Sequence, residues 1–480
     1  MNFKLSNLVA ATLAGSMLMG FGANAMADST TDIVNALVSK GVLTEEEGAL
    51  LTKGRTDEAA GQAKAIKKAG KLKISDAIDS ATVYGDIRVR YEDRSGSGPV
   101  VANGVDVNSN IDRARYKMTL GVKTESGDFY TDLAMAMGAS GRSDNATFGK
   151  TAGTLNAKEA LFIKRAMIGY KATDWLTVEA GRMENPLYTT PMVWDADLTV
   201  EGLSEKFKYK ANDNLELFGV AGQWAYKGER QLIETTVSSA TPTNELFAFQ
   251  GGAKYTINDR TSAKAAMTYS SVSSNNTGAN FKPGTAKALY ATNSAVNDLD
   301  TIEIPAEINY MATSSVGVRL FGDYVYNTSG KDRFNKAVLA TAIGTDRNAV
   351  AAAGNDDTAW MLGVAIGSAK DLKAFEGNKM AKGDWSARLW YQDVGAYSVD
   401  QNAVDSDIFD SRVNMKGTIL KAQYNVQDNV FVNFAYGHGT RKNGLLAAAG
   451  SASDLNATLA PQGMNLSSFD LVQLDLTYKF

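Results

Sequence analysis

The sequence has 480 residues, of which 44% are hydrophobic, and it contains 44 glycines, 7 prolines and no cysteine. Its 49 Lys and Arg residues against 53 Asp and Glu give a net charge of -4, which offers no electrostatic case for a nucleic-acid partner. The lack of cysteine and the single histidine, His438, exclude cysteine-based zinc sites, cysteine nucleophiles and haem attachment motifs. We therefore expect neither a metal nor a cofactor.

Residues 1–27 have the features of a secretory signal peptide. Lys4 is the only charge, the stretch 8–23 is apolar and rich in small residues, and Ala25-Met26-Ala27 fits the small-residue cleavage site. The alternative is an N-terminal transmembrane anchor, which the short apolar run disfavours. The segment predicts an exported protein.

Residues 28–80 are predicted to form a periplasmic helical hairpin or coiled-coil segment. Polar residues 29–32 offer N-caps before apolar residues at helical spacing, and Gly41 can end that helix. Thr44 and Glu47 then fit a capping box, in which each side chain bonds the other's backbone N–H. A role for this segment in binding a partner has no support in the sequence.

From Ala81 onward, apolar and polar residues alternate, which is typical of half-buried strands. About sixteen such segments follow, each long enough for the roughly 9–11 residues of a tilted membrane-spanning strand. They lie near 83–92, 112–123, 128–138, 159–172, 174–183, 201–211, 214–226, 245–257, 261–272, 301–312, 316–327, 357–368, 384–395, 412–426, 429–438 and 468–480.

The connectors alternate between short polar turns, such as 125–127 and 427–429, and long segments. This asymmetry is typical of bacterial outer-membrane barrels. The exception is 369–383, which is long where a short turn is expected, and Pro305 is expected near a strand start, where its missing N–H is tolerated. The long connectors are 93–111, 139–158, 184–200, 227–244, 273–300, 328–356, 396–411 and 439–467.

The C-terminal strand 469–480 places five apolar residues, ending with Tyr478 and Phe480, on one face and polar residues on the other. This ending resembles the assembly signal of outer-membrane barrels, read by the barrel-assembly machinery. No run of 18 apolar residues follows residue 27, which excludes a spanning helix. We therefore predict an all-β fold: residues 81–480 form an antiparallel transmembrane barrel of about sixteen strands in the cell outer membrane.

Two stretches, 37–47 (LVSKGVLTEEE) and 181–202, which contains Gly181-Arg182-Met183-Glu184-Asn185-Pro186, carry a family resemblance. The sequence resembles Gram-negative outer-membrane porins, and in particular the putative porin family with an N-terminal helical segment. The resemblance implies a water-filled channel of sixteen strands that assembles as a homotrimer, surrounded by outer-membrane lipid and lipopolysaccharide. It does not indicate which solutes pass.

Because outward faces must be apolar, the opposite faces of the strands are expected to line the lumen. Fewer acids are expected there (Asp86, Asp132, Glu179, Asp323 and Asp475) than bases, and such an excess would favour anions. In the alternative interpretation the charges are paired across strands and only keep the lumen wet. The predicted basic stripe comprises Arg88, Arg90, Arg113, Arg115, Lys117, Arg165, Arg319 and Arg388, with Lys206 and Lys208 also inward.

The third long connector, 184–200, is the candidate constriction loop, since the third loop of porins commonly folds into the barrel. Its two prolines would stiffen it, and its two aspartates could face the basic stripe and create a transverse field. The alternative is an outward loop with an Asx turn at Asp195. The residues singled out are Pro186, Tyr188, Pro191, Trp194, Asp195 and Asp197.

These features predict passive diffusion of small hydrophilic solutes with a mild anion preference, and no enzymatic activity. One alternative is an outer-membrane barrel hydrolase, for which His438, between Gly437 and Gly439, would be the only candidate imidazole base. The other is a structural barrel or a sheath around a partner such as an electron-transfer cytochrome.

Overall fold

The computed structural model describes residues 77–99, 106–138, 143–149, 158–227, 244–273, 298–340, 344–368, 381–446, 455 and 466–480. The chain divides into two units, 1–82 and 83–480, and the second unit holds the barrel. The predicted signal peptide (1–27) and nearly all of the predicted helical segment (28–80) lie outside the described residues.

Eighteen strands build this unit, and every pair of bonded neighbours for which a register is given is antiparallel. They are β1 (Ser80–Pro99), β2 (Asp106–Ser126), β3 (Phe129–Gly138), β4 (Ala146–Thr147), β5 (Ala160–Lys171), β6 (Leu176–Glu184), β7 (Thr199–Lys210), β8 (Leu215–Lys227), β9 (Asn244–Asn258), β10 (Thr261–Ser273), β11 (Asp300–Glu303), β12 (Ala306–Met311), β13 (Gly317–Asn327), β14 (Thr358–Gly367), β15 (Trp385–Val394), β16 (Met415–Gln427), β17 (Val430–Arg441) and β18 (Ser468–Lys479).

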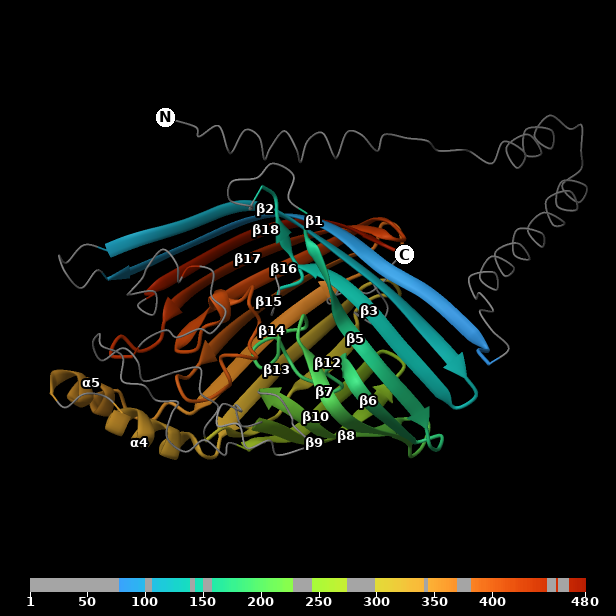
Figure 1. Cartoon of the computed structure of the whole chain (residues 1–480), viewed down its shortest axis with the longest axis horizontal. Coiled ribbons are helices and arrows are strands. Elements are labelled where there is room, and N and C mark those ends of the chain that lie inside the picture. Colours follow the sequence, from blue (N-terminus) through green and yellow to red (C-terminus); the bar gives the residue numbers. More distant parts are fainter. Residues whose placement is uncertain are drawn as a thin grey trace, which may run out of the picture. The chain divides into compact units, whose positions relative to one another are not determined.

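The strands close into a ring, because β1 pairs with both β2 and β18 (Figure 1). β11 and β12 are two halves of one strand, since both pair with β10 on one side and β13 on the other. The two-residue β4 only extends the pairing on β2 beyond β3. When β11 and β12 are counted as one strand and β4 is counted with β3, sixteen spanning strands remain. This number confirms the predicted closed antiparallel barrel.

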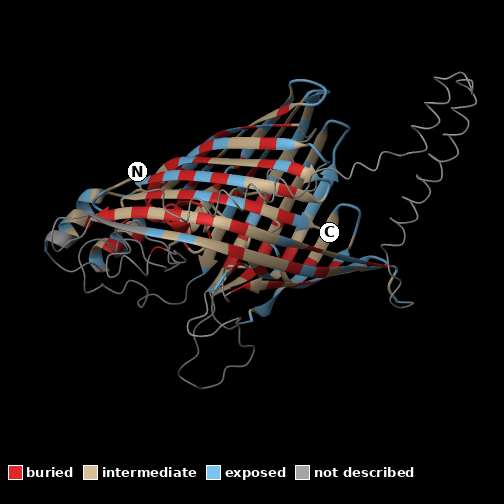
Figure 2. Cartoon of the chain, turned by 90° about the horizontal axis from the view of Figure 1, so that it is seen from above, coloured by how far each residue is buried: buried red, intermediate tan, exposed pale blue. Residues whose placement is uncertain are grey.

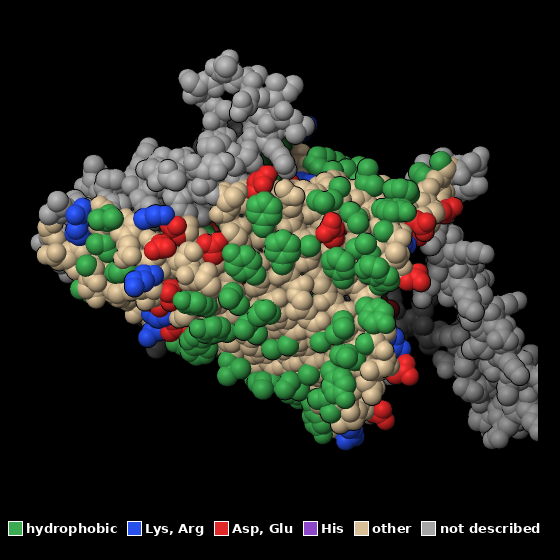
Figure 3. Space-filling view, turned by 90° about the horizontal axis from the view of Figure 1, so that it is seen from below, with side chains coloured by type: hydrophobic (Ala, Val, Ile, Leu, Met, Phe, Trp, Pro, Cys, Tyr) green, Lys and Arg blue, Asp and Glu red, His purple; other side chains and the backbone are tan. Residues whose placement is uncertain are grey.

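Burial alternates residue by residue along the strands, so that buried and exposed bands follow each other around the wall (Figure 2). On β14, Met361 and Ala365 point inward and are almost fully buried, while the adjacent residues Trp360, Leu362 and Ile366 are exposed. Hydrophobic side chains cover much of the outer face seen in Figure 3. Such a surface suits lipid rather than water, so the barrel carries its apolar face outside.

Two strands extend further than the sequence predicts. β1 continues to Pro99 and β2 begins at Asp106, so most of the predicted connector 93–111 is strand, and that prediction was wrong. The reason is that both faces of this extension are polar, as in Glu92-Asp93-Arg94-Ser95, and polar alternation carries no hydrophobic period.

Pro305 lies inside a spanning strand rather than at its start, and it separates β11 from β12 because it cannot donate to the ladder. The connector 328–356 contains two helices that were not predicted, α4 (Gly330–Ala340) and α5 (Thr345–Ala353). None of the helices within the described ranges has the length and apolar character to cross a membrane.

Candidate channel interior

The basic side chains of β1 and β2 pair with acids on β1 itself, on the adjacent strand β18 and on a loop. The guanidinium of Arg90 donates to Asp475 of β18 at 2.7 and 2.9 Å and to Asp407 at 2.8 Å. Arg113 Nη2 lies 2.5 Å from Glu92, and Arg115 lies 3.8 Å from the same carboxylate. This part of the predicted stripe is therefore a network of paired charges rather than an isolated positive wall.

The network contains two residues that the sequence analysis missed. Glu92 is fully buried, and Arg94, 2% exposed, contacts it at 3.0 Å. Arg94 also reaches Asp407 at 2.6 Å and Asp410 at 3.2 Å. The sequence feature that indicates these two residues is the charge at every second position, 88, 90, 92 and 94. It was overlooked because the strand was predicted to end at 92.

A β-bulge turns two consecutive basic residues of β5 into the lumen. The pairing of β5 with β3 shifts between Ala134 and Met135, at the point where Lys164 is skipped. A bulge breaks the strict alternation of side chains. Lys164 consequently contacts Asp144 and lies 3.8 Å from Asp197, while Arg165 contacts Asp132 at 3.1 Å.

The other predicted luminal residues lie on the remaining strands. Arg319 pairs with Glu307 at 3.6 Å, and Arg388 lines the luminal cavity described below. Lys206 contacts Glu179, whereas Lys208, whose side chain is 71% exposed, lies 3.2 Å from Glu216.

The loop 184–200 runs through the lumen from one wall to the other. At one end the hydroxyl of Tyr188 donates to Glu307 of β12 at 3.1 Å, and the hydroxyl of Thr190 donates to Asp323 of β13. At the other end Asp197 lies 3.4 Å from Lys117 of β2. Following the bonded neighbours from β1, β2 is second and β12 tenth of the sixteen spanning strands, so these anchors lie on opposite walls.

The remaining residues of this loop support its inward path. The Asx turn expected at Asp195 is present, since the backbone N–H of Asp197 donates to Asp195 Oδ1 at 2.9 Å. The loop nevertheless runs inward rather than outward. Trp194 Nε1 donates to the carbonyl of Leu198 at 3.3 Å. The carbonyl of Pro191 accepts from Asp405 N at 3.1 Å, and Pro186 stands near the start of the loop.

A second loop, 395–414, also packs inside the barrel and was not predicted to do so. Its backbone joins the first loop where Asp195 N donates to Ala403 O at 2.6 Å and Ser406 N donates to Asp195 Oδ2 at 3.0 Å. It also buries apolar side chains against β16, β18 and the first loop. They include Val399, Val404, Ile408, Phe409 and Val413, packed with Met192, Met415, Phe469 and Leu471.

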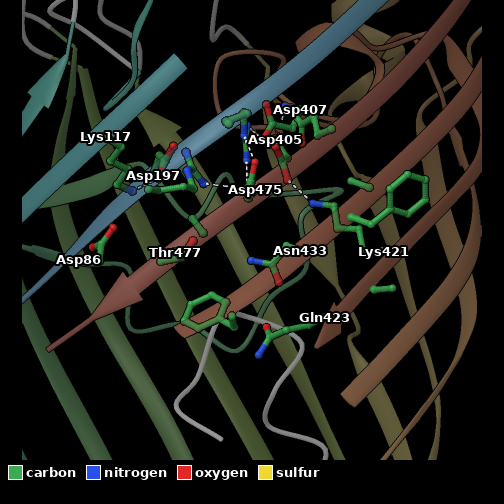
Figure 4. Close-up of a pocket in the computed structure, with 18 of the residues that line it drawn as sticks. Asp86, Lys117, Asp197, Asp405, Asp407, Lys421, Gln423, Asn433, Asp475 and Thr477 are labelled. Carbon is green, nitrogen blue, oxygen red and sulfur yellow. Dashed lines mark hydrogen bonds and ion pairs between the residues drawn. The ribbon is translucent and has the colours of Figure 1, made fainter. Parts of the chain in front are cut away.

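Beside these loops lies a cavity of about 310 Å³ lined by charged and polar side chains (Figure 4). Six of its lining side chains are basic and six are acidic, so it lacks the excess of basic residues that the strand pattern predicted. Four of the acids come from the two loops. The bases are Arg88, Arg90, Lys117, Arg388, Lys421 and Lys479, and the acids are Asp86, Asp195, Asp197, Asp405, Asp407 and Asp475.

Two of the loop acids, Asp197 and Asp407, have a lowered pKa and are held in their charged form. Burial opposes the ionisation of Asp197, but the attraction of Lys117, Lys164 and Arg88 outweighs it and lowers its pKa. Burial likewise opposes the ionisation of Asp407, while Arg90 and Arg94 bring its pKa well below the ordinary value. Negative loops therefore face positive walls across the cavity.

A family model described as putative porin matches residues 93–294 and 275–480. The chain belongs to the putative porin family. No curated protein matches it. The family and the closed barrel agree with the resemblance seen in the sequence, and they make this porin an outer-membrane protein with a porin-like role.

The C-terminal residues of the porin help to close its ring. Phe480 N and O each bond the backbone of Gly85 at 3.0 Å, which joins β18 to β1. A Cβ on Gly85 would lie 2.3 Å from Thr119 O and 2.7 Å from the Phe480 ring, so only glycine fits. Tyr478 and Phe480 are exposed on the outer face, as expected for an interfacial pair.

His438 lies outside the lumen of the porin. It is on the outer face of β17, where Nδ1 lies 2.7 Å from Asp470 of β18. No group of three or more His, Asp or Glu suited to a metal occurs in the described part of the chain.

Proposed function

We propose that this porin lets small hydrophilic solutes diffuse passively across the outer membrane, and that the loops 184–200 and 395–414 form its constriction. The main support is the path of the first loop across the lumen, since it contacts Glu307 on one wall and Lys117 on the opposite wall. Charged side chains on both loops keep the narrowest region polar, and therefore wettable.

The equal number of acids and bases around the cavity argues against a strong charge preference. We propose at most a mild preference for anions, because the luminal side chains of β1 and β2 are mostly basic, although acids of β18 and of the loops pair with several of them. The proposal has three further parts. The protein is exported through residues 1–27, and the barrel-assembly machinery recognises its C-terminal strand. It then assembles as a homotrimer in an outer membrane that contains lipopolysaccharide.

The alternative roles have less support. A sheath around a cytochrome would need a lumen open to that partner, whereas two loops with buried contacts fill part of it. A hydrolase would need a base near a nucleophile, whereas the imidazole of His438 faces outward.

Planar-bilayer recording of the purified porin tests the proposal. We expect stepwise conductance increases, with a reversal potential in a salt gradient displaced slightly towards that of the anion. No stepwise conductance would contradict the channel, and displacement towards the cation would contradict the selectivity alone. His438→Ala, on the outer face, serves as a matched control and should conduct as the unaltered protein does.

A further inference from the structure

The side-chain amide of Gln250, on the luminal face of β9, binds the main chain of loop 184–200. The backbone N–H of Tyr188 donates to Gln250 Oε1 at 2.9 Å, and Gln250 Nε2 donates to the carbonyl of Tyr188 at 2.9 Å. A neighbouring strand would exchange the same two bonds with a residue in a ladder. The contacts of Tyr188 and Thr190 with Glu307 and Asp323 involve side-chain hydroxyls, whereas Gln250 holds both backbone polar groups of one loop residue.

Thr268, the direct partner of Gln250 on β10, orients this amide. Gln250 is 6% exposed and Thr268 is fully buried. Gln250 Nε2 also donates to Thr268 Oγ1 at 2.7 Å, so the NH₂ group has two acceptors. The orientation of the amide follows from its partners, because the backbone N–H of Tyr188 can only donate and its carbonyl can only accept. The wall therefore presents a fixed donor and a fixed acceptor to the loop.

The ring of Tyr188 is held as well. Lys264 Nζ of β10 lies 3.6 Å from the ring centroid, and the ring of Phe218 on β8 meets it edge-on with centroids 6.2 Å apart. A cation over a ring face and an edge-to-face ring pair are both favourable arrangements. Residue 188 is therefore fixed by its backbone, its ring and its hydroxyl.

Packing leaves room for this part of the loop to move. A cavity of about 60 Å³ borders Tyr188, Thr190 and Pro191, and a second cavity of about 60 Å³ borders Leu187 and Val193. Atoms that line a void lose van der Waals contacts on that side. The position of the segment consequently depends on its polar contacts, among which the two bonds to Gln250 act on the backbone directly.

We propose that Gln250 is a positioning residue of the constriction: through the backbone of Tyr188 it sets how far loop 184–200 stands from the β9 wall, and hence the width of the opening beside the loop. This inference rests on the proposed channel function. Because Gln250 is buried and contacts the main chain of the loop, it acts on solutes only through the loop. Without the amide, the two backbone groups of Tyr188 lose these partners, so the loop should spend part of its time away from the wall.

The test records single-channel currents of the purified porin. Gln250→Leu is similar in size but cannot form the bonds, and it should visit a second conductance level. We expect the fraction of time at that level to rise about tenfold, the effect of one net hydrogen bond. Thr268→Val removes only the hydroxyl that orients the amide and should show the same change to a smaller extent. Gln223→Leu, exposed on the outer face of the adjacent β8, is the matched control and should conduct as the unaltered protein does.

Denaturant unfolding of the same samples separates positioning from stability. If Gln250→Leu unfolds more easily but conducts at the unaltered level alone, or if Gln223→Leu shows an equal second level, the proposal is wrong. If Gln250→Leu does not fold, Thr268→Val decides, since an unchanged current contradicts the proposal and a new level supports it.

If the unaltered protein does not conduct, the proposed channel function fails instead. Hydrogen exchange at the Tyr188 amide then tests the positioning by itself. Faster exchange in Gln250→Leu than in Gln223→Leu supports the role of Gln250, and equal exchange contradicts it.

Discussion

The two loops inside the barrel are held by different kinds of contact. Loop 395–414 packs an apolar core around Phe409 and is tied to β1 by the ion pairs of Arg90 and Arg94. Loop 184–200 also buries Met192 in that core, but its two ends are fixed to the walls by polar contacts of Tyr188, Thr190 and Asp197. The two loops therefore differ in role. Loop 395–414 stabilises the barrel through its apolar core, and loop 184–200 places polar groups in the path of solutes.

The backbone of the 395–414 loop fits this division. Phe409, Asp410 and Ser411, which form the short 3-10 turn η2 (Phe409–Ser411), all have positive φ values, of 49°, 57° and 60°. Such conformations cost free energy for residues other than glycine and persist only where the surroundings impose them. Here the buried apolar and ionic contacts impose them.

Phe409→Ala is expected to have the largest effect. The ring is 1% exposed and packs edge-on against Phe469 with centroids 6.4 Å apart. Its loss should lower the free energy of unfolding by about 3–5 kcal/mol, as for other buried aromatic truncations. Denaturant unfolding measures this, and Leu339→Ala, 70% exposed on α4, is the control. Equal effects of both substitutions would remove the distinction between the loops.

Thr190→Val should have a smaller effect on stability and a larger one on current. The hydroxyl of Thr190 donates to buried Asp323, and its loss leaves a carboxylate oxygen unsatisfied, at a cost of about 1–3 kcal/mol. We expect more frequent current fluctuations in bilayer recordings as the loop detaches. Thr440→Val, on the exposed outer face of β17, should not change the noise, and identical noise in both variants would contradict the anchoring role.

Acid should weaken the 395–414 loop before it affects the apolar core. Because the folded pKa of Asp407 lies below its unfolded value of about 3.9, the stability that its charge contributes is present above that pH and is lost as the pH falls below it. Thermal unfolding from pH 7 to 3 should show this loss. Asp407→Asn should flatten the dependence below pH 4, and an unchanged slope would contradict the proposed role of its ion pairs.

Asp197→Asn should have the smallest effect on stability and a measurable one on selectivity. Removing this charge leaves Lys117 and Lys164 with less compensation, so the reversal potential in a salt gradient should move towards the anion. Asp213→Asn, in a turn where the side chain is 98% exposed, is the control and should not move it. A shift towards the cation would contradict the assigned position of Asp197.

The barrel was predictable from the sequence, because alternation on strands such as β14 and β18 is imposed by lipid on one side and the lumen on the other. Several of the predicted basic residues, such as Arg88, Arg90 and Lys117, line the cavity, whereas Lys421 and Lys479, which also line it, were not predicted to face inward. The second loop was missed, because its burial depends on Arg90 and Arg94, which are distant in the sequence from Asp407 and Asp410.

Local irregularities were beyond the reach of periodicity. The bulge at Lys164 moves a residue that alternation places outside into the lumen, and a bulge has no fixed sequence signature. The helices α4 and α5 were not predicted, because no helical spacing of apolar residues was recognised in the connector 328–356. Asp405 and Asp407 were not predicted among the acids of the cavity, because they reach it from the second loop, which was expected to be an ordinary connector.

The central claim is that loop 184–200 narrows a conducting lumen. The most direct measurement compares the unitary conductance of the porin with that of a variant in which residues 186–197 are replaced by a short Gly-Ser linker. We predict stepwise conductance for both and a several-fold larger step for the variant, because the wall-to-wall segment from Tyr188 to Asp197 is gone. Equal steps from the two folded proteins would contradict the account.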